Sequence, residues 1–154
     1  AQQMSDAVND ALDGAQQGTQ PRYSVFIAVA AVADWRVANY SDSKIKKTGD
    51  DFTPTLQFAQ NPDILAGVAQ RANGPWCVGF AAESDDLERN GADKRRRKNV
   101  PLLVANIGHA TFGRDDNELL LIDEAGMTRL PRASKDALAR ALVDQIGQRA
   151  PRPR

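Results

Sequence analysis

The order of apolar and polar positions along the chain predicts helices that alternate with strands. Apolar residues at helical spacing, preceded by capping residues such as Asn61 and Ser134, indicate amphipathic helices. These helices are expected over residues 4–12, 61–69, 85–98 and 134–146. Nearly uninterrupted apolar runs are typical of strands buried on both faces of a parallel sheet. Such runs occupy residues 23–33, 76–82 and 102–106.

The remaining segments are interpreted from their turn residues and from alternation. Residues 34–51 lack periodicity, which indicates a functional loop, because long structureless connections are uncommon unless they bind something or move. A short strand weakened by Pro54 is expected over residues 52–59. Residues 119–122 and 127–130, which flank a turn, predict a hairpin.

This element order predicts the fold class and the place of a ligand site. Strands alternating with helices indicate an α/β fold with right-handed crossovers. We expect a Rossmann-like three-layer sandwich with a mostly parallel sheet, followed by a C-terminal β-hairpin and a helix. Residues 1–148 are expected to form one domain and residues 149–154 a disordered tail. Ligands bind beyond the carboxyl ends of the strands in such folds, which selects residues 31–34, 80–83 and 105–106.

Composition and charge exclude several classes of protein. The 154 residues fit one domain, and 20 basic side chains balance 20 acidic ones, so attraction of the whole molecule to nucleic acid or membrane is not indicated. A single cysteine, Cys77, excludes an internal disulfide framework, and a single histidine, His109, argues against a histidine-built metal centre or a Ser-His-Asp triad. No apolar run approaches the roughly 20 residues of a membrane helix, and the first residues lack the pattern of a secretory signal. We therefore expect a reduced, cytoplasmic setting.

Two stretches near the first strand carry candidate chemistry. Small residues such as Ala28 and Ala30 let a flat ligand approach the backbone, and Asp34 offers acceptors for ribose hydroxyls or an amino group. Close helix–sheet packing and a turn cap explain the same residues equally simply. Lys44-Ile45-Lys46-Lys47 places three ammonium groups on one loop, where they suit phosphate oxygens or form only a solvated charge run.

Two later stretches also suit an anionic ligand. Residues 61–65 place backbone N–H groups at a helix start, where they face a ligand or serve only capping. Lys94 and Lys98 are four residues apart, hence on one helical face, and with the arginines between them they suit a phosphate chain, a nucleic acid or solvent. Cys77 lies in mid-strand and is expected to be a small buried group rather than a nucleophile. No GxGxxG pattern or P-loop is present, which argues against the usual dinucleotide and NTPase folds.

The order and spacing of these stretches resemble phosphopantothenoylcysteine synthetase, the CTP-dependent phosphopantothenate–cysteine ligase of coenzyme A synthesis. The resemblance extends from about Ala1 to Gln148. The motifs that carry it are Ala30-Ala31-Val32-Ala33-Asp34-Trp35, Lys44-Ile45-Lys46-Lys47, Asn61-Pro62-Asp63-Ile64-Leu65, Gly79-Phe80-Ala81-Ala82-Glu83, the run from Lys94 to Lys98, and Ala105-Asn106.

The resemblance implies a nucleotide site and a two-step reaction. The residues implied to hold CTP are Ala28, Val29, Ala30, Asp34, Lys44, Pro62, Asp63, Ile64, Leu65, Phe80, Lys94 and Lys98. Lys44 would be the catalytic lysine of a mobile loop, and Lys94 and Lys98 would bind the triphosphate. The carboxylate of phosphopantothenate attacks the α-phosphate of CTP, which releases pyrophosphate and leaves an acyl-cytidylate, and the amino group of cysteine then displaces CMP. Both steps gather negative charge, so lysines and backbone N–H groups suffice without a protein nucleophile.

The resemblance also implies partners. Mg2+ would accompany the triphosphate, although no carboxylate ligand is singled out, and FMN would belong to a fused or associated phosphopantothenoylcysteine decarboxylase. A homodimer would form through residues 52–58 or 119–130. Family members carry a further strand–helix portion, with an Asn-containing Ser-Ser-Gly motif, that binds phosphopantothenate. Nothing in this chain matches it, so we expect the N-terminal strands of the family domain to be absent, a sheet edge to be exposed and the chain alone to be poorly active.

Two other functions remain open from the sequence. An NAD(P)-dependent reductase-like domain suits the strand–helix alternation, but it requires a Gly-rich first turn, which is missing, and a Tyr-x-x-x-Lys pair. A non-enzymatic RNA-binding module would use the basic residues between Arg89 and Lys98 and the Arg-Pro tail. Such a module predicts steeply salt-dependent binding to any RNA and no preference among free nucleotides.

Overall fold

The computed structural model describes residues 1–18, 22–46, 53–108, 111 and 113–151. Its helices are α1 (Gln2–Gln16), α2 (Ile64–Ala69), α3 (Leu87–Lys98) and α4 (Lys135–Arg149). Its strands are β1 (Val25–Ala28), β2 (Trp35–Val37), β3 (Phe58–Gln60), β4 (Trp76–Glu83), β5 (Leu102–Ile107), β6 (Asp116–Ile122) and β7 (Met127–Ser134). Within these residues, no helix combines the length and the apolar character needed to cross a membrane.

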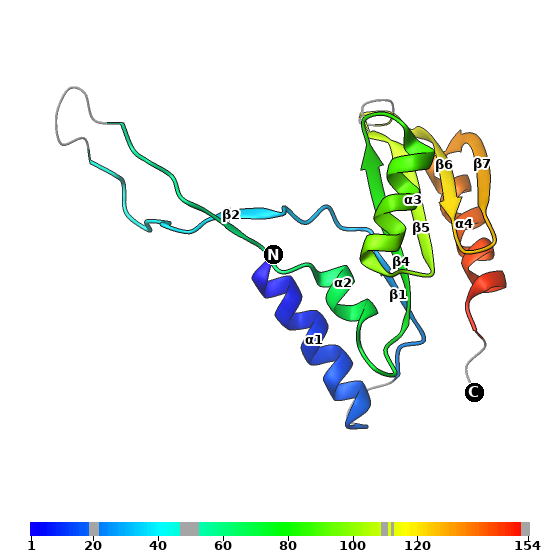
Figure 1. The fold of residues 1–154 in the computed structure, drawn as a ribbon, viewed down its shortest axis with the longest axis horizontal. Helices are drawn as coiled ribbons and strands as arrows, with labels where there is room; N and C mark the ends of the chain where they lie inside the picture. The colour runs from blue at the N-terminus through cyan, green and yellow to red at the C-terminus, as the bar shows by residue number, and fades with distance from the viewer. Residues whose placement is uncertain (19–21, 47–52, 109–110, 112, 152–154) are drawn as a thin grey trace.

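Five strands form one mixed sheet in the order β1-β4-β5-β6-β7 (Figure 1). The first three are parallel, with Ala28 opposite Gly79 and Phe80 opposite Val104, whereas β6 and β7 each run antiparallel to the strand before them. The predicted α/β class is therefore confirmed. The predicted C-terminal hairpin is also confirmed, and its strands β6 and β7 extend the same sheet beyond β5.

Two apolar clusters fill the space on the two faces of this sheet. On one face, Cys77 and Leu103 pack with Leu12 of α1 and Val68 of α2, and α3 lies against the same cluster. On the other face, Val78 packs in a cluster to which α4 contributes Leu138, Leu142 and Ile146. Neighbouring residues of β4 thus point into opposite clusters, which is the alternation that a strand imposes. The described chain thus has three layers, with α1, α2 and α3 on one face of the sheet and α4 on the other.

The first strand is shorter than the sequence predicts, and it is not buried on both faces. Pairing with β4 ends at Ala28, Ile27 is 41% exposed and Val29 is 61% exposed. β1 lies at one edge of the described sheet, and β7 at the other, so only one side of β1 has a partner strand. The apolar residues 29–33 are not part of the sheet. The sequence did not predict this, because a run of small apolar side chains looks the same in a buried strand and in an irregular segment.

The prediction of a long loop over residues 34–51 is partly wrong. β2 pairs antiparallel with β3, with Trp35 opposite Gln60. The two strands begin a two-armed segment, here called the ribbon (described residues 35–46 and 53–60), which projects away from the five-stranded sheet (Figure 1). The strand expected over residues 52–59 is reduced to Phe58–Gln60. Pro54, which has no N–H to donate to a partner strand, precedes the paired part. Phe52 lies outside the described residues.

The predicted cap of the last helix, Ser134, is confirmed, whereas α2 is capped by Asp63 and not by Asn61. Asp63 accepts a hydrogen bond from the N–H of Ala66 at 3.1 Å, and Ser134 accepts one from Ala137 at 3.2 Å. Pro62 precedes the capping residue, so it restricts the entry to α2 and lies outside the helix itself. Helix α4 continues to Arg149. The tail expected from residue 149 stays a prediction, because residues 152–154 lie outside the described part of the chain.

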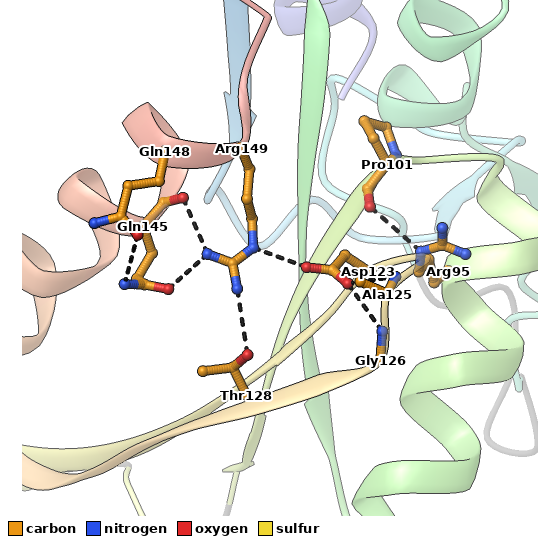
Figure 2. A network of polar contacts seen from close by, with 9 residues as sticks. All are labelled: Arg95, Pro101, Asp123, Ala125, Gly126, Thr128, Gln145, Gln148 and Arg149. Carbon is orange, nitrogen blue, oxygen red and sulfur yellow. Dashed lines mark hydrogen bonds and ion pairs between the residues drawn. The ribbon is translucent and has the colours of Figure 1, made fainter.

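A polar network attaches the end of α4 to the turn between β6 and β7 (Figure 2). Arg149 donates from Nε to Oδ2 of Asp123 at 2.8 Å and from Nη2 to Oγ1 of Thr128 at 3.2 Å. Oδ1 of Asp123 accepts the N–H groups of Ala125 and Gly126 at 2.8 and 3.1 Å. Burial alone would raise the pKa of Asp123, but Arg149 and the two N–H groups outweigh burial and hold that pKa below its ordinary value.

The lowered pKa of Asp123 predicts a pH-dependent contribution to stability. A carboxyl whose pKa is lower in the folded state stabilises the fold above the unfolded-state pKa, and it loses that effect as the pH falls through the folded-state pKa. We expect Asp123→Asn to lower the free energy of unfolding at pH 7 by about 1–3 kcal/mol. The difference from the unaltered chain should shrink at pH 3, as measured by urea unfolding at both pH values.

The control for this prediction is Asp136→Asn. Asp136 pairs with Arg140 in the same helix, but both side chains are more than three-quarters exposed, at 76% and 78%. Exposed pairs contribute little to stability, so this variant should unfold like the unaltered chain at both pH values. A similar loss of stability in the two variants would contradict the assigned role of the Asp123 network.

Candidate functional site

A cavity of about 700 Å3 opens at the carboxyl end of β1. Its walls come from stretches that are far apart in the sequence. They are two residues of α1, residues 26–35, residues 60–65, Phe80 and Leu103 of the sheet, and Lys94, Arg97 and Lys98 of α3. This position agrees with the rule that ligand sites in α/β folds lie beyond the carboxyl ends of the strands.

One wall is the segment that follows β1. From Ala28 to Ala33 the side chains are small or β-branched, and all of them border the cavity together with Asp34. The absence of bulky side chains leaves the backbone accessible to a flat ligand. Asp34 is exposed at the end of this wall and borders the cavity.

A second wall is the entry to α2, from Gln60 to Leu65. The backbone N–H of Asn61 donates to the carbonyl of Asp34 at 2.8 Å, and the side-chain amide of Asn61 donates to the carbonyl of Ala33 at 2.8 Å. These bonds join the two walls. One of the backbone N–H groups at this helix start, that of Ala66, already donates to the capping side chain of Asp63 and is therefore not available to a ligand.

Cationic side chains of α3 close the cavity on its third side. Lys94, Arg97 and Lys98 recur at the spacing of one helical face and all border the cavity. Lys94 Nζ lies 3.2 Å from Oε1 of Glu83, with the two side chains 31% and 19% exposed, and Lys98 forms an ion pair with Asp63. Two of the cations are thus held against the wall by carboxylates.

The charge of Asp63 is stabilised by these neighbours. Partial burial would raise its pKa, but the hydrogen bond from Lys98, the N–H of Ala66 and the charges of Lys98 and Arg97 outweigh burial, so the pKa of Asp63 lies below its ordinary value. At neutral pH this part of the wall is therefore a charged pair, with a further positive charge from Arg97 beside it.

The structure brings together every residue that the resemblance assigns to the nucleotide except Lys44. The residues that border the cavity are Ala28, Val29, Ala30, Asp34, Pro62, Asp63, Ile64, Leu65, Phe80, Lys94 and Lys98. Lys44 and Lys46 are exposed on the ribbon, outside the cavity lining, and Lys47 lies outside the described residues. Tyr40 and Lys44 have the spacing of a Tyr-x-x-x-Lys pair, but Tyr40 is 75% exposed on the ribbon and does not border the cavity either.

Several lining residues were not selected as site residues from the sequence. Asn61 opens a motif that the sequence analysis quotes, and Arg97 belongs to the basic run, so a signal existed for both. Trp35 and Gln60 border the cavity because they face each other at the base of the ribbon, and Met4 does so from α1. Trp35 closes a motif that the sequence analysis quotes, whereas the contacts of Gln60 and Met4 depend on long-range packing, for which the local sequence holds no signal.

The basic run of α3 does not form one continuous cationic surface. Arg95 donates to the carbonyl of Pro101 at 3.3 Å, and Arg96 pairs with Asp93, whereas Lys94, Arg97 and Lys98 border the cavity. The run is thus divided between structural contacts and the cavity, which favours a small anionic ligand over a long nucleic acid.

The described residues do not form a metal cage. No group of three or more His, Cys, Asp or Glu side chains among them is arranged to hold a metal ion. Two of the carboxylates close to the cavity, Asp63 and Glu83, are engaged by lysines. His109, the single histidine, lies outside the described residues.

Comparison with known proteins gives consistent results. Residues 1–149 match the family described as the DNA/pantothenate metabolism flavoprotein C-terminal domain. The coenzyme A biosynthesis bifunctional protein CoaBC of Vibrio cholerae serotype O1 is 44% identical over 128 residues, which cover 80% of this chain and 32% of that protein. The chain thus spans about a third of the length of the curated relative.

Two solved structures share the fold. The C-terminal domain of a coenzyme A biosynthesis bifunctional protein CoaBC has a TM-score of 0.60 and 27% identity, with 90% of this chain and 60% of that chain covered. A mutant of Cab2, in complex with phosphopantothenate-cysteine, has a TM-score of 0.61 and 18% identity, with 80% of this chain and 44% of that chain covered. The second likeness concerns the fold alone.

The environment of Cys77 predicts an unreactive thiol. Cys77 is 1% exposed, its Sγ lies 3.3 Å from the carbonyl of Pro75, and burial raises its pKa to about 11. At pH 8 we expect the folded chain to react with an aromatic disulfide reagent roughly a hundredfold more slowly than the chain unfolded in urea, because the thiolate is the reacting form.

A chain carrying Cys77→Ala and Val143→Cys provides the control, since Val143 is 62% exposed on α4. Its thiol should react at similar rates in the folded and unfolded states. If the natural thiol also reacted equally fast in both states, its assignment as a buried structural group would be wrong.

Proposed function

Because the chain belongs to the family of the DNA/pantothenate metabolism flavoprotein C-terminal domain, we propose that it forms the CTP-binding part of a phosphopantothenate–cysteine ligase of coenzyme A synthesis. The observation that carries the proposal is the cavity, because residues assigned to the nucleotide by resemblance, from four separate stretches of the chain, line one hollow. The relative from Vibrio cholerae is a bifunctional protein of coenzyme A biosynthesis, which agrees with this assignment.

The cavity has a cationic side and a side of small and apolar residues, and this difference suggests how CTP is held. The cationic side, formed by Lys94, Arg97 and Lys98, suits the triphosphate, because ammonium and guanidinium groups form charge-assisted hydrogen bonds with phosphate oxygens. The segment after β1 and the entry to α2 offer small side chains and backbone groups to the cytidine, and Phe80 offers an apolar surface. The cations would also stabilise the negative charge that develops as pyrophosphate leaves.

Lys44 is proposed as the catalytic lysine on the resemblance of the Lys-x-Lys-Lys motif. It lies on the ribbon whose base, formed by Trp35 and Gln60, borders the cavity. A lysine suits this role because it is a compact charge on a flexible stem, which can follow a phosphate that moves during the reaction.

The remaining partners follow from the family. We propose that phosphopantothenate and cysteine are the other substrates, that the residues that bind phosphopantothenate lie outside this chain, and that the parent protein is a cytoplasmic homodimer with an associated FMN-dependent decarboxylase. Magnesium is commonly bound through substrate phosphates with only one or two protein carboxylates. We propose that it enters in this way here, since the described residues offer no preformed cage.

The proposal predicts a preference for CTP in a thermal-shift measurement. A ligand that binds only the folded state raises the melting temperature, and the shift grows with its affinity. At equal concentrations, CTP should raise the melting temperature of this chain more than ATP or NADH does. Equal shifts for the three ligands would reject the nucleotide assignment, and salt-dependent binding to RNA without any effect of CTP would support the RNA-binding alternative.

The division of the cavity predicts which variants lose the phosphate contacts. Lys94→Met and Lys98→Met should each weaken CTP binding by roughly ten- to hundredfold, the range expected for a lost hydrogen bond to a charged group. Cytidine, which has no phosphate, should bind each variant as it binds the unaltered chain, as measured by calorimetry.

Lys135→Met is the matched control for these variants. Lys135 is an exposed lysine at the start of α4 and does not border the cavity, so the variant should bind CTP normally. If the α3 variants lost cytidine and CTP to the same extent, the lysines would not act on the phosphates.

A further inference from the structure

We infer that Asn61 is a positioning residue, which holds the two long walls of the cavity in the arrangement that the nucleotide requires. The inference rests on the proposed function of the cavity. Nothing in the comparisons assigns a role to this residue, and the resemblance assigns the nucleotide to its neighbours, Pro62 to Leu65, and to Asp34.

Asn61 binds two consecutive peptide groups of the wall that follows β1. Its side-chain Nδ2 donates to the carbonyl of Ala33 and its backbone N–H donates to the carbonyl of Asp34, each at 2.8 Å. The side-chain contact joins residues 28 positions apart in the sequence. Two bonds from one residue to adjacent carbonyls restrict both the distance between the walls and their relative rotation.

The far end of the wall after β1 is held by this attachment together with the pairing of β2 and β3. Its pairing with the sheet ends at Ala28, and the bonds within it are local, such as that from the N–H of Val32 to the carbonyl of Ala30 at 3.0 Å. Asp34 lies at the far end of this wall, and Asn61 holds the peptide groups at that end. The same residue precedes Pro62 and Asp63, so one side chain connects the proposed nucleotide contacts of both walls.

Arg36 orients the amide of Asn61. Its guanidinium donates from Nη1 to Oδ1 of Asn61 at 3.3 Å, and the same atom also donates to the carbonyl of Gln60. With the amide oxygen engaged by Arg36, the amide nitrogen faces Ala33 and acts as the donor. Arg36 is not a lining residue of the cavity, so its influence on a ligand would pass through Asn61 and through the carbonyl of Gln60.

The ribbon supplies a closely matched comparison residue, Asn39. Its side chain also joins two segments across the ribbon, since Nδ2 donates to the carbonyl of Thr55 at 3.0 Å and Oδ1 accepts the N–H of Gln57 at 2.9 Å. Asn39 does not border the cavity. Loss of its amide therefore removes a comparable pair of bonds without touching either wall.

The test compares CTP affinity in variants of this chain by calorimetry. Asn61→Ala keeps the backbone bond to Asp34 and removes the side-chain bond to Ala33, and we expect it to weaken CTP binding about tenfold. Asn61→Asp keeps the size and the acceptor but loses the donor, so it should bind CTP as weakly as Asn61→Ala. Asn39→Ala should bind CTP within about twofold of the unaltered chain, a difference below 1 kcal/mol.

A double-mutant cycle with Arg36 separates positioning from a general loss of stability. Arg36→Ala should weaken CTP binding by about threefold, and adding it to Asn61→Ala should cause a smaller further loss than it causes alone, because the amide through which Arg36 acts in part is already missing. Melting temperatures without nucleotide should fall by similar amounts in the Asn61→Ala and Asn39→Ala chains, so stability alone would not explain a difference in affinity.

Each failure has a distinct signature. Equal weakening of CTP binding by Asn61→Ala and Asn39→Ala, or additive losses in the double variant, would overturn the role of Asn61 while leaving the nucleotide site intact. An unaltered chain that does not bind CTP at all would overturn the proposed function, and the role of Asn61 with it.

Discussion

The parallel pairing of β1 with β4 is the constraint on which the site depends. Their register, from Val25 opposite Trp76 to Ala28 opposite Gly79, determines where the chain leaves the sheet. β4 itself cannot slide, because a shift of one residue would exchange Cys77 and Val78 between the two apolar clusters. The position of the cavity is thus determined by burial several residues away from it, and α3, which follows β4 in the chain, brings its cationic face to the same edge.

The sequence was most informative where burial is strongest. β4, β5 and the hairpin were predicted because long apolar runs and turn residues are local signals, and α4 was predicted from its Ser134 cap and its apolar face. The end of β1 was missed, since Val29 and the alanines after it look alike in a strand and in a cavity wall. The pairing of Trp35 with Gln60 was missed as well, because contacts between distant segments are not recorded in either segment alone.

The candidate site shows the same division between local and long-range information. The motifs identified most of the stretches that matter, and the residues assigned to the nucleotide line one cavity except Lys44 on the ribbon, whereas Ala105-Asn106 and residues 81–83 do not border it. What the motifs could not supply is the set of contacts that joins those stretches. The pairs of Lys98 with Asp63 and of Lys94 with Glu83 are examples, since each links residues of separate elements. In a protein with equal numbers of acidic and basic residues, it is geometry rather than composition that brings three cationic side chains of α3 to one cavity.

Hydrogen bonds between the two arms of the ribbon separate its outer part from the cavity. The N–H of Ala38 donates to the carbonyl of Gln57 at 2.7 Å, and Asn39 binds both Thr55 and Gln57, so the two arms are joined before the chain continues outward. Loop-closure entropy rises only slowly with length. A change in chain length beyond Asn39 would therefore cost little stability and leave the cavity walls undisturbed, but it would displace Lys44, so the position of the proposed catalytic lysine can change independently of the cavity.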